Sequence, residues 1–400
     1  MRRATDHDCY TGRVPRLAPF RALRFDPAVA GPLDLLTAPP YDVISGPNRE
    51  RLRERSPYNI VHVDLADDPG EDVDERYRRA AATLHAWRHE GVLALDDTPS
   101  YYGYELRFPW AGGSRTLRGV LGALELEPFG RGVLPHEQTM EGPIADRLRL
   151  LRATGTQLSP IYGVVAGPSA ALADALDAVT REPPLAAVHD EEEVDHRVWA
   201  LPPDLDVGAL LRELPVLIAD GHHRYATALA YRDERRRDGP GPWDAVMFLI
   251  VDAAHENVPV LPYHRVQVAG QPPDGGLSRR ALGDVLAELD DAALRYGSVT
   301  RADGRVLYRL HDLTGDPPTV RALHDQILDR TAPGDDLRFT HDARDADRAV
   351  RDGTALAAYL LPPTTPDRIR GVVERGERLP RKSTFFWPKP RTGLVMMPVV

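Results

Sequence analysis

The sequence contains almost no lysine. Of its 50 basic residues only Lys382 and Lys389 are lysines, and both lie near the C-terminus. A Walker P-loop needs a lysine after its glycine-rich turn, and a protein-kinase fold needs a lysine on a strand. Neither arrangement can be built upstream of residue 382. Any phosphate chemistry would therefore rest on arginine, histidine, backbone amides and metal.

Cysteine and long apolar runs are scarce as well. The single Cys9 excludes an internal disulfide framework and any site made from several cysteines, which fits a reducing compartment. No apolar run reaches the length that crosses a bilayer, and the first residues lack the apolar core of a signal peptide. We therefore expect a cytoplasmic protein with no membrane role.

The chain also lacks an excess of positive charge. Its formal net charge is -10, which argues against nucleic acid as a partner because phosphate-backbone binding needs a positive surface. A local arginine patch remains open. The 400 residues, 42% of them hydrophobic, are enough to bury substantial cores and suggest two or three structural units.

Hydrophobic periodicity predicts an α/β (α+β) fold. Residues 183–203, rich in proline and acidic residues, are expected to form a surface excursion. We expect three regions: an N-terminal α/β region (1–112), a central core (113–272), and a C-terminal α/β region with a tail that packs back on the core (273–400). The predicted helices cover residues 48–55, 73–89, 144–153, 225–237, 279–289, 320–328 and 367–374. The predicted strands cover residues 101–108, 116–126, 160–165, 215–219, 245–251, 258–268, 306–311 and 355–361.

The strongest local signal is the turn Asp220-Gly221-His222-His223-Arg224. A buried strand precedes the turn and an amphipathic helix follows it. The free backbone amides and the dipole of that helix favour binding of an anion, and phosphate is the expected ligand. Asp220 could cap the helix or hold a cation. In the simpler interpretation Asp220 is only a cap and the histidines are solvated, but three consecutive donors favour a functional turn.

Neither histidine-containing segment of this sequence matches a zinc-binding motif. His222 and His223 are adjacent and project about 100° apart on a helix, so they do not converge on one metal. His136-Glu137 begins like a metalloprotease helix, but Met140 stands where the second ligand belongs. Glu137 could instead serve as a general base, or it could be an ordinary surface glutamate.

Four segments together carry a resemblance to a known family. They are residues 39–45 (PPYDVIS), 136–139 (HEQT) with Asp146-Arg147, the turn 220–225 (DGHHRY), and the tail 380–390 (PRKSTFFWPKP). The chain resembles the free-serine kinases of the ParB/sulfiredoxin-like superfamily. It is more closely similar to a large set of serine-kinase-like proteins catalogued as a domain of unknown function. The resemblance implies a ParB/sulfiredoxin-like phosphate-binding core with N-terminal and C-terminal α/β additions.

That resemblance implies phosphoryl transfer from ATP or ADP to the hydroxyl of free L-serine, giving O-phosphoserine, with Mg²⁺ as cofactor. By analogy Glu137 would accept the hydroxyl proton, Asp220 would position substrate or Mg²⁺, and the turn would hold the phosphate. Nucleotide and L-serine or a similar metabolite would be the partners, and a homodimer is left open. The candidate site residues are Glu137, Asp220, His223 and Arg224 for catalysis; Gly221, His222, His223, Arg224, Tyr225, His136, Lys382, Ser383 and Thr384 for phosphate or nucleotide; Asp42, Asp146 and Arg147 for substrate; and Asp220 for metal.

Several alternatives stay open. The tail around Lys382 and Lys389 could pack toward the anion site, or it could be a terminal strand whose aromatics cover a core. A ParB-like nucleotide-binding regulator without metabolite turnover is the second functional candidate, although no helix-turn-helix with a basic face is recognisable. A sulfiredoxin-like repair enzyme would need a reactive cysteine near the turn, which Cys9 is poorly placed to supply.

Overall fold

The computed structural model describes residues 16–66, 72–166, 170–211, 214–332 and 334–400, so Cys9 lies outside the described residues. The chain divides into two compact units. Unit 1 contains Met1–Pro135, Thr139–Asn257 and Pro388–Val400, and unit 2 contains His136–Gln138 and Val258–Trp387. The three regions expected from sequence have other boundaries and stay a prediction.

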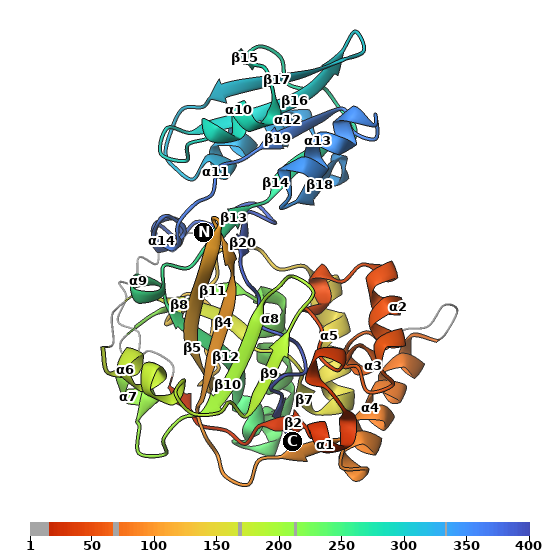
Figure 1. The fold of residues 1–400 in the computed structure, drawn as a ribbon, viewed down its shortest axis with the longest axis vertical. Coiled ribbons are helices and arrows are strands. Elements are labelled where there is room, and N and C mark those ends of the chain that lie inside the picture. Colours follow the sequence, from red (N-terminus) through yellow and green to blue (C-terminus); the bar gives the residue numbers. More distant parts are fainter. Residues whose placement is uncertain (1–15, 67–71, 167–169, 212–213, 333) are drawn as a thin grey trace, which may run out of the picture. The chain divides into compact units, whose positions relative to one another are not determined.

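A nine-stranded mixed sheet forms the centre of unit 1 (Figure 1). Strand β8 pairs antiparallel with β11 and parallel with β12, while β12, β5, β4, β10 and β9 follow as antiparallel neighbours. In sheet order the strands are β6 (Val133–Leu134), β11 (Val216–Asp220), β8 (Ile161–Val165), β12 (Ala245–Asp252), β5 (Gly113–Glu125), β4 (Tyr102–Trp110), β10 (Asp195–Ala200) and β9 (Ala186–His189), with β1 (Leu17–Ala18) beside β5.

Helices surround this sheet and bury their apolar sides. Helix α5 packs against α4 and α8, and α8 contacts strands β8 and β12. Ser45 caps α2 by accepting a hydrogen bond from the Asn48 amide, as the sequence predicts. The helices are α1 (Pro27–Ala30), α2 (Gly46–Arg55), α3 (Val61–Asp64), α4 (Val73–His89), α5 (Glu141–Thr154), α6 (Ala170–Val179), α7 (Val207–Leu210), α8 (His222–Arg235) and α9 (Ala253–Glu256).

Two short strand pairs complete unit 1. Strand β2 (Leu23–Phe25) pairs with β3 (Leu93–Leu95), and β7 (Thr156–Gln157) pairs with β21 (Met397–Pro398) at the C-terminus. The last residues of the chain are therefore part of the unit that contains its first described residues.

A six-stranded sheet organises unit 2. In order its strands are β15 (Leu277–Arg279), β17 (Arg305–Asp312), β16 (Arg295–Ala302), β19 (Ala357–Leu360), β14 (His264–Gln267) and β18 (Leu337–Thr340). A separate pair joins β13 (Val260–Pro262) to β20 (Thr384–Phe386). The helices are α10 (Leu282–Ala287), α11 (Thr319–Leu323), α12 (Asp329–Thr331), α13 (Ala343–Arg351) and α14 (Pro366–Glu374), with a π-helical turn at His324–Leu328.

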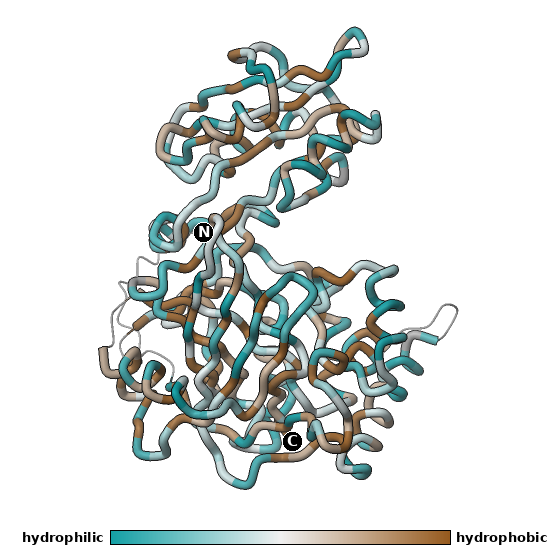
Figure 2. Tube along the Cα trace, viewed as in Figure 1, coloured by the Kyte–Doolittle hydropathy of each residue, from teal (hydrophilic) through white to brown (hydrophobic). Residues whose placement is uncertain are grey.

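Most predicted elements are present and the mixed α/β class is confirmed. Within each unit, hydrophobic residues recur along the strands and hydrophilic residues along loops and outer helical turns (Figure 2). Among the described residues, no helix combines the length and the apolar character needed to cross a bilayer.

The expected surface excursion at residues 183–203 is wrong. This segment supplies β9 and β10, and β10 pairs with β4 along its whole length. The Asp190 carboxylate accepts hydrogen bonds from the Glu192 and Val194 amides, so the acidic residues form the hairpin turn between the strands. Further differences occur in unit 2. The strand expected at 258–268 is divided into β13 and β14, and β16, β18 and α13 have no counterpart among the predicted elements.

Candidate functional site

The turn after β11 is shorter than the sequence suggests. Helix α8 begins at His222, three residues before the predicted start, and Gly221 alone forms the turn with φ of +100°. Asp220 is not the helix cap: Gly221 holds that position without a side-chain capping bond. Of the two roles that the sequence leaves open for Asp220, capping the helix is therefore wrong, and its carboxylate makes other contacts.

Two cationic side chains meet the Asp220 carboxylate. Arg224 forms an ion pair with Asp220 Oδ2, and Lys389 Nζ lies 2.5 Å from Asp220 Oδ1. Lys389 also lies 3.4 Å from Asp42 Oδ2. We name Asp42, Asp220, Arg224 and Lys389 the corner cluster. Its members come from the N-terminal segment, the end of β11, the first turn of α8 and the C-terminal tail.

Arg224 is fixed by more than its ion pair. Its Nη1 donates to Ser159 Oγ at 2.9 Å and to the Pro160 carbonyl. The guanidinium lies over Gly221, since a Cβ built there would be 3.1 Å from Arg224 Nη2. A positive charge thus stands beside the amide donors that open α8, at the place where the sequence predicts an anion.

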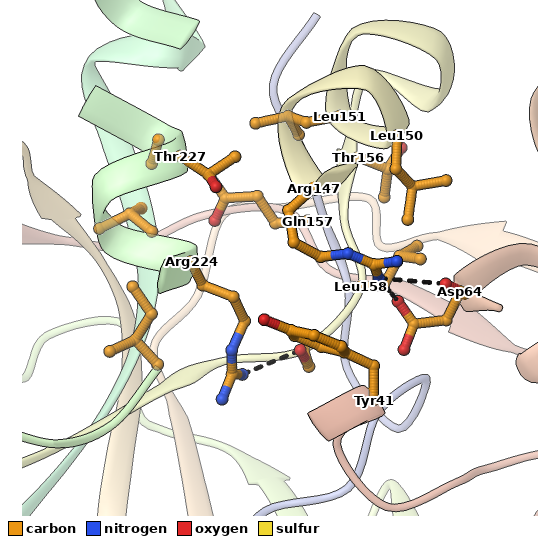
Figure 3. A pocket seen from close by; sticks show the side chains of 14 residues that line it. Tyr41, Asp64, Arg147, Leu150, Leu151, Thr156, Gln157, Leu158, Arg224 and Thr227 are labelled. Atoms are coloured by element: carbon orange, nitrogen blue, oxygen red, sulfur yellow. Dashed lines mark hydrogen bonds and ion pairs between the residues drawn. The ribbon is translucent and has the colours of Figure 1, made fainter. Parts of the chain in front are cut away.

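A pocket of about 60 Å³ adjoins Arg224 within unit 1 (Figure 3). Its polar lining includes Tyr41, Asp64, Arg147 and Arg224, and leucine side chains of α5 line it as well. The sequence did not single out Tyr41 or Asp64 as site residues. The resembling segment 39–45 contains Tyr41 and is a signal that could have found it, whereas nothing marks Asp64.

Arg147 holds the charged side of this pocket together. Its Nη1 lies 2.8 Å from Asp64 Oδ1, and its Nη2 lies 2.6 Å from Asp146 Oδ2. Its guanidinium also stands 4.3 Å from the centre of the Tyr41 ring. Arg76 and the Tyr77 hydroxyl donate to Asp146. Two of the predicted substrate residues, Asp146 and Arg147, therefore form one partly buried network with Asp64.

Burial sets the protonation of these groups. It raises the pKa of Asp64 above its ordinary value, against the opposing charges of Arg147 and Arg224. Burial also raises the pKa of Tyr41 to about 12, with Asp42 adding to the effect. For Asp146 burial alone would raise the pKa, but Arg147 and the Tyr77 hydrogen bond outweigh it and the pKa falls. Asp146 therefore stays ionised beside Arg147.

The remaining residues of the turn have structural partners. His223 Nε2 accepts a hydrogen bond from the Met140 amide at 3.1 Å, which joins α8 to the start of α5. His222 is buried, and Tyr225 is fully buried. The Tyr225 hydroxyl donates to the Glu127 carbonyl at 2.8 Å, so Tyr225 supports the core and we leave it out of the proposed site.

Glu137 and the residues 382–384 form a second group, in unit 2. Glu137 Oε1 accepts a hydrogen bond from the Ser383 amide at 3.0 Å. Fully buried His136 places Nε2 at 2.7 Å from Thr384 Oγ1, and the Leu379 amide donates to the His136 carbonyl. The structure thus brings together all five predicted residues of this group: four of them share these hydrogen bonds, and Lys382 adjoins Ser383.

A fully buried arginine, which the sequence did not single out, fixes the loop beside Glu137. Arg265 donates to the Lys382 carbonyl at 2.9 Å and to the Arg381 carbonyl at 3.3 Å. Burial lowers the pKa of Arg265 to about 9, and the charge of Glu137 opposes that fall. Lys382 itself has φ of +54° and places Nζ 5.4 Å from the centre of the Tyr263 ring. Lys389 belongs to the Asp220 group and Lys382 to the Glu137 group.

The expected magnesium ligand Asp220 does not fit that role. Mg²⁺ requires oxygen ligands in near-octahedral geometry and repels ammonium and guanidinium groups. Both Asp220 oxygens are in contact with cations, one with Arg224 and the other with Lys389. Among the residues that the structure describes, no group of three or more histidine, cysteine or acidic residues is arranged to hold a metal. Magnesium carried on nucleotide phosphates would not need Asp220.

Comparisons with known proteins give one family match and several distant structural likenesses. A family model described as "Protein of unknown function (DUF1015)" matches residues 17–293. No curated protein matches the chain. Solved structures with a distant likeness include "Free serine kinase in complex with AMP", with 14% identity over 67% of this chain and 88% of that chain and a TM-score of 0.36.

Two further solved structures show a similarly low sequence identity and TM-score. A conserved hypothetical protein from Pyrococcus furiosus has 14% identity over 65% of this chain and 89% of its own, with a TM-score of 0.34. SbnI with a C-terminal truncation, from Staphylococcus aureus, has 11% identity over 67% of this chain and 84% of its own, also with a TM-score of 0.34.

Proposed function

We propose that this chain, which belongs to the DUF1015 family, is a nucleotide-dependent phosphotransferase that acts on the hydroxyl of a small metabolite, with free L-serine as the first candidate. The corner cluster is the observation that carries the proposal. Arg224 and Lys389 converge where a buried strand passes into a helix, beside the amides of the first turn of α8. Phosphoryl transfer asks a protein chiefly for positioning and for neutralisation of phosphate charge.

The proposed reaction moves one phosphoryl group and one proton. The serine hydroxyl oxygen forms a bond to the terminal phosphorus, and the bond from that phosphorus to the nucleotide's bridging oxygen breaks. The hydroxyl proton passes to a carboxylate acting as general base. Glu137 has this role by resemblance alone. The amides of α8 and the guanidinium of Arg224 would stabilise the charge on the transferring phosphoryl oxygens.

The choice of acceptor also follows from the resemblance. Segments 136–139 and 220–225 are the parts of the sequence that resemble free-serine kinases. The pocket beside Arg224 adds a physical argument, because Arg147 and Arg224 both line it. Its arginines suit recognition of a carboxylate, which every free amino acid carries.

A direct assay tests the reaction. Purified protein is incubated with Mg²⁺, ATP or ADP, and L-serine, L-threonine or homoserine, and products are identified by mass spectrometry and ³¹P NMR. We expect O-phosphoserine. Absence of any phosphorylated product with both nucleotides and all three acceptors would refute the proposal. Nucleotide binding without turnover would favour the regulator instead.

Glu137→Gln tests the base. The expected loss of kcat is about 10²-fold to 10⁴-fold, since the proton acceptor is removed. The glutamine oxygen can still accept the Ser383 amide hydrogen bond, so the loop should stay in place and nucleotide binding should be retained. Exposed Glu141→Gln, four residues later in the sequence and in the first turn of α5, is the matched control. Normal turnover by Glu137→Gln would show that another group takes the proton.

A further inference from the structure

Lys389 occupies an unusual position for a residue so near the end of the chain. Its ammonium lies between two carboxylates, 2.5 Å from Asp220 and 3.4 Å from Asp42. Its side chain is only 9% exposed. Lysine side chains are rarely this buried unless they are paired, because removing an ammonium from water is costly. The contact is therefore a specific feature of unit 1.

The chain on the C-terminal side of Lys389 fixes its position. Arg391 is 2% exposed, and its guanidinium donates to the Thr37 carbonyl at 3.0 Å and to Glu191 at 3.1 Å. The Thr392 and Ala38 backbones exchange hydrogen bonds in both directions. Only one residue separates Lys389 from Arg391, so the backbone that carries the ammonium is held firmly against the N-terminal segment.

Two carboxylates on one side of a phosphate site normally need a cation between them. Asp220 and Asp42 would otherwise repel each other and the incoming phosphate. Enzymes of phosphoryl transfer commonly place Mg²⁺ there. In this chain the ammonium of Lys389 lies between the Asp220 and Asp42 carboxylates. Arg224 forms an ion pair with the other oxygen of Asp220.

We propose that Lys389 takes the place of a divalent cation on Asp220 and Asp42, so that nucleotide phosphates reach the corner cluster without a metal bound to Asp220. This inference rests on the proposed function for its ligand, a nucleoside diphosphate. Lys389 acts as a positioning residue: it neutralises the two carboxylates and holds Asp220 where Arg224 can meet it. In the alternative, Lys389 only holds the C-terminal tail in place. Substituting Lys389 would then not change how the affinity for ADP depends on Mg²⁺.

Calorimetric titration of ADP separates these interpretations. ADP is titrated into wild type and Lys389→Met, once with EDTA and once with Mg²⁺. For wild type we expect affinities within about threefold of each other, because the carboxylates are already neutralised. For Lys389→Met we expect roughly tenfold or greater weakening in EDTA, and recovery with Mg²⁺ as the metal replaces the ammonium.

Three companion variants sharpen the test. Lys389→Arg keeps the charge and should keep metal-independent binding. Combining Asp220→Asn with Lys389→Met removes one carboxylate together with the ammonium, and should restore part of the binding in EDTA. Arg152→Met removes an exposed ion pair with Glu234 between α5 and α8, and should leave ADP binding unchanged in both conditions. Thermal unfolding of each variant reports whether it is folded.

The outcomes distinguish this inference from the proposed function. Metal-dependent ADP binding by wild type would overturn it, and this arm needs no variant. It would also be overturned if folded Lys389→Met bound ADP like wild type in both conditions, or if wild type bound ADP in neither. If ADP binding followed the expected pattern but no acceptor were phosphorylated, the proposed function would fail and the role of Lys389 would stand.

Discussion

At the scale of single residues, Gly221 determines how the corner cluster is built. Its φ of +100° lies in a region that residues with a Cβ rarely adopt, and it reverses the chain between β11 and α8 in one step. The Arg224 guanidinium lies directly above it and from there reaches Asp220 and Ser159. Backbone strain and arginine placement would therefore change together.

We expect Gly221→Ala to destabilise unit 1 by about 1–3 kcal/mol, because alanine is strained at this φ and its Cβ would come within 3.1 Å of Arg224 Nη2. Urea unfolding measures the loss, and ADP titration should show weakened binding as Arg224 is displaced. Gly142→Ala, in α5 with nothing within 4 Å of its Cβ, is the control and should be neutral or stabilising. Equal effects of the two substitutions would contradict this account.

Local signals in the sequence were enough to find some site residues but not others. Asp220, Gly221 and Arg224 stand together in one motif, so chemistry and spacing could be read from a short segment. Asp64 is different: it becomes part of the pocket only because α3 brings it to Arg147 on α5. Lys389 stands out as one of two lysines in the sequence. Its contact with Asp220 joins residues far apart in the sequence, so spacing does not predict it.

At the scale of elements, length and regular periodicity decided which predictions held. Helix α4 and the pair β11–α8 carry sustained patterns, and the structure has them within a few residues of the expected bounds. Strands β9 and β10 are short and border on prolines and acidic residues, so local composition indicated a loop. Pairing with β4 supplied the stabilisation that their own sequence does not signal.

Strand β14 begins with a histidine that should make the stability of the fold depend on pH. His264 is buried, and its Nδ1 accepts a hydrogen bond from the Leu361 amide at 3.1 Å. Burial, with Arg265 adding to it and Asp342 opposing, lowers the pKa of His264 from 6.5 to about 4. The folded state therefore holds His264 neutral, while the unfolded chain takes up a proton below pH 6.5.

The sign of the effect follows from that difference. As the pH falls from 6.5 toward 4 the unfolded state binds more protons, so the free energy of unfolding falls by up to about 3 kcal/mol. We expect His264→Asn to flatten this part of the profile, because the Asn oxygen can accept the Leu361 amide without titrating. Urea unfolding of both proteins between pH 4.5 and 7.5 measures it. Exposed His85→Asn should keep the wild-type slope, and an unchanged slope in His264→Asn would disprove the assignment.

At the scale of the whole molecule, the two units are interleaved in the sequence. Apart from His136–Gln138, unit 2 occupies one stretch of chain between Asn257 and Pro388, and the chain then returns to unit 1 for its last residues. A reading of sequence order alone assigns those residues to the C-terminal region. Their return depends on pairing with the opposite end of the chain, where Met396 exchanges backbone hydrogen bonds with Leu23. No local pattern encodes such a partner.

The returning tail should be indispensable for unit 1. Leu394, Val395, Met396, Met397 and Val399 are each at most 3% exposed. Burying one such side chain contributes about 1.5–3 kcal/mol, so five together approach the whole free energy of unfolding of a typical domain. Lys389 and Arg391 would be lost with them, leaving Asp220 and Glu191 without these cationic partners.

We therefore expect a chain that ends at Trp387 to lose the folded state of unit 1. Circular dichroism should show loss of cooperative unfolding. Limited proteolysis with mass spectrometry should find cleavage within β11 and α8, and we expect both elements to resist cleavage in the full chain. Removing Val400 alone, a residue 66% exposed, should change the free energy of unfolding by no more than about 0.5 kcal/mol. If a chain ending at Trp387 unfolded at the same urea midpoint as the full-length chain, unit 1 would be stable without its tail. The contact of Lys389 with Asp220 would then form after unit 1 has folded and would not contribute to its folding.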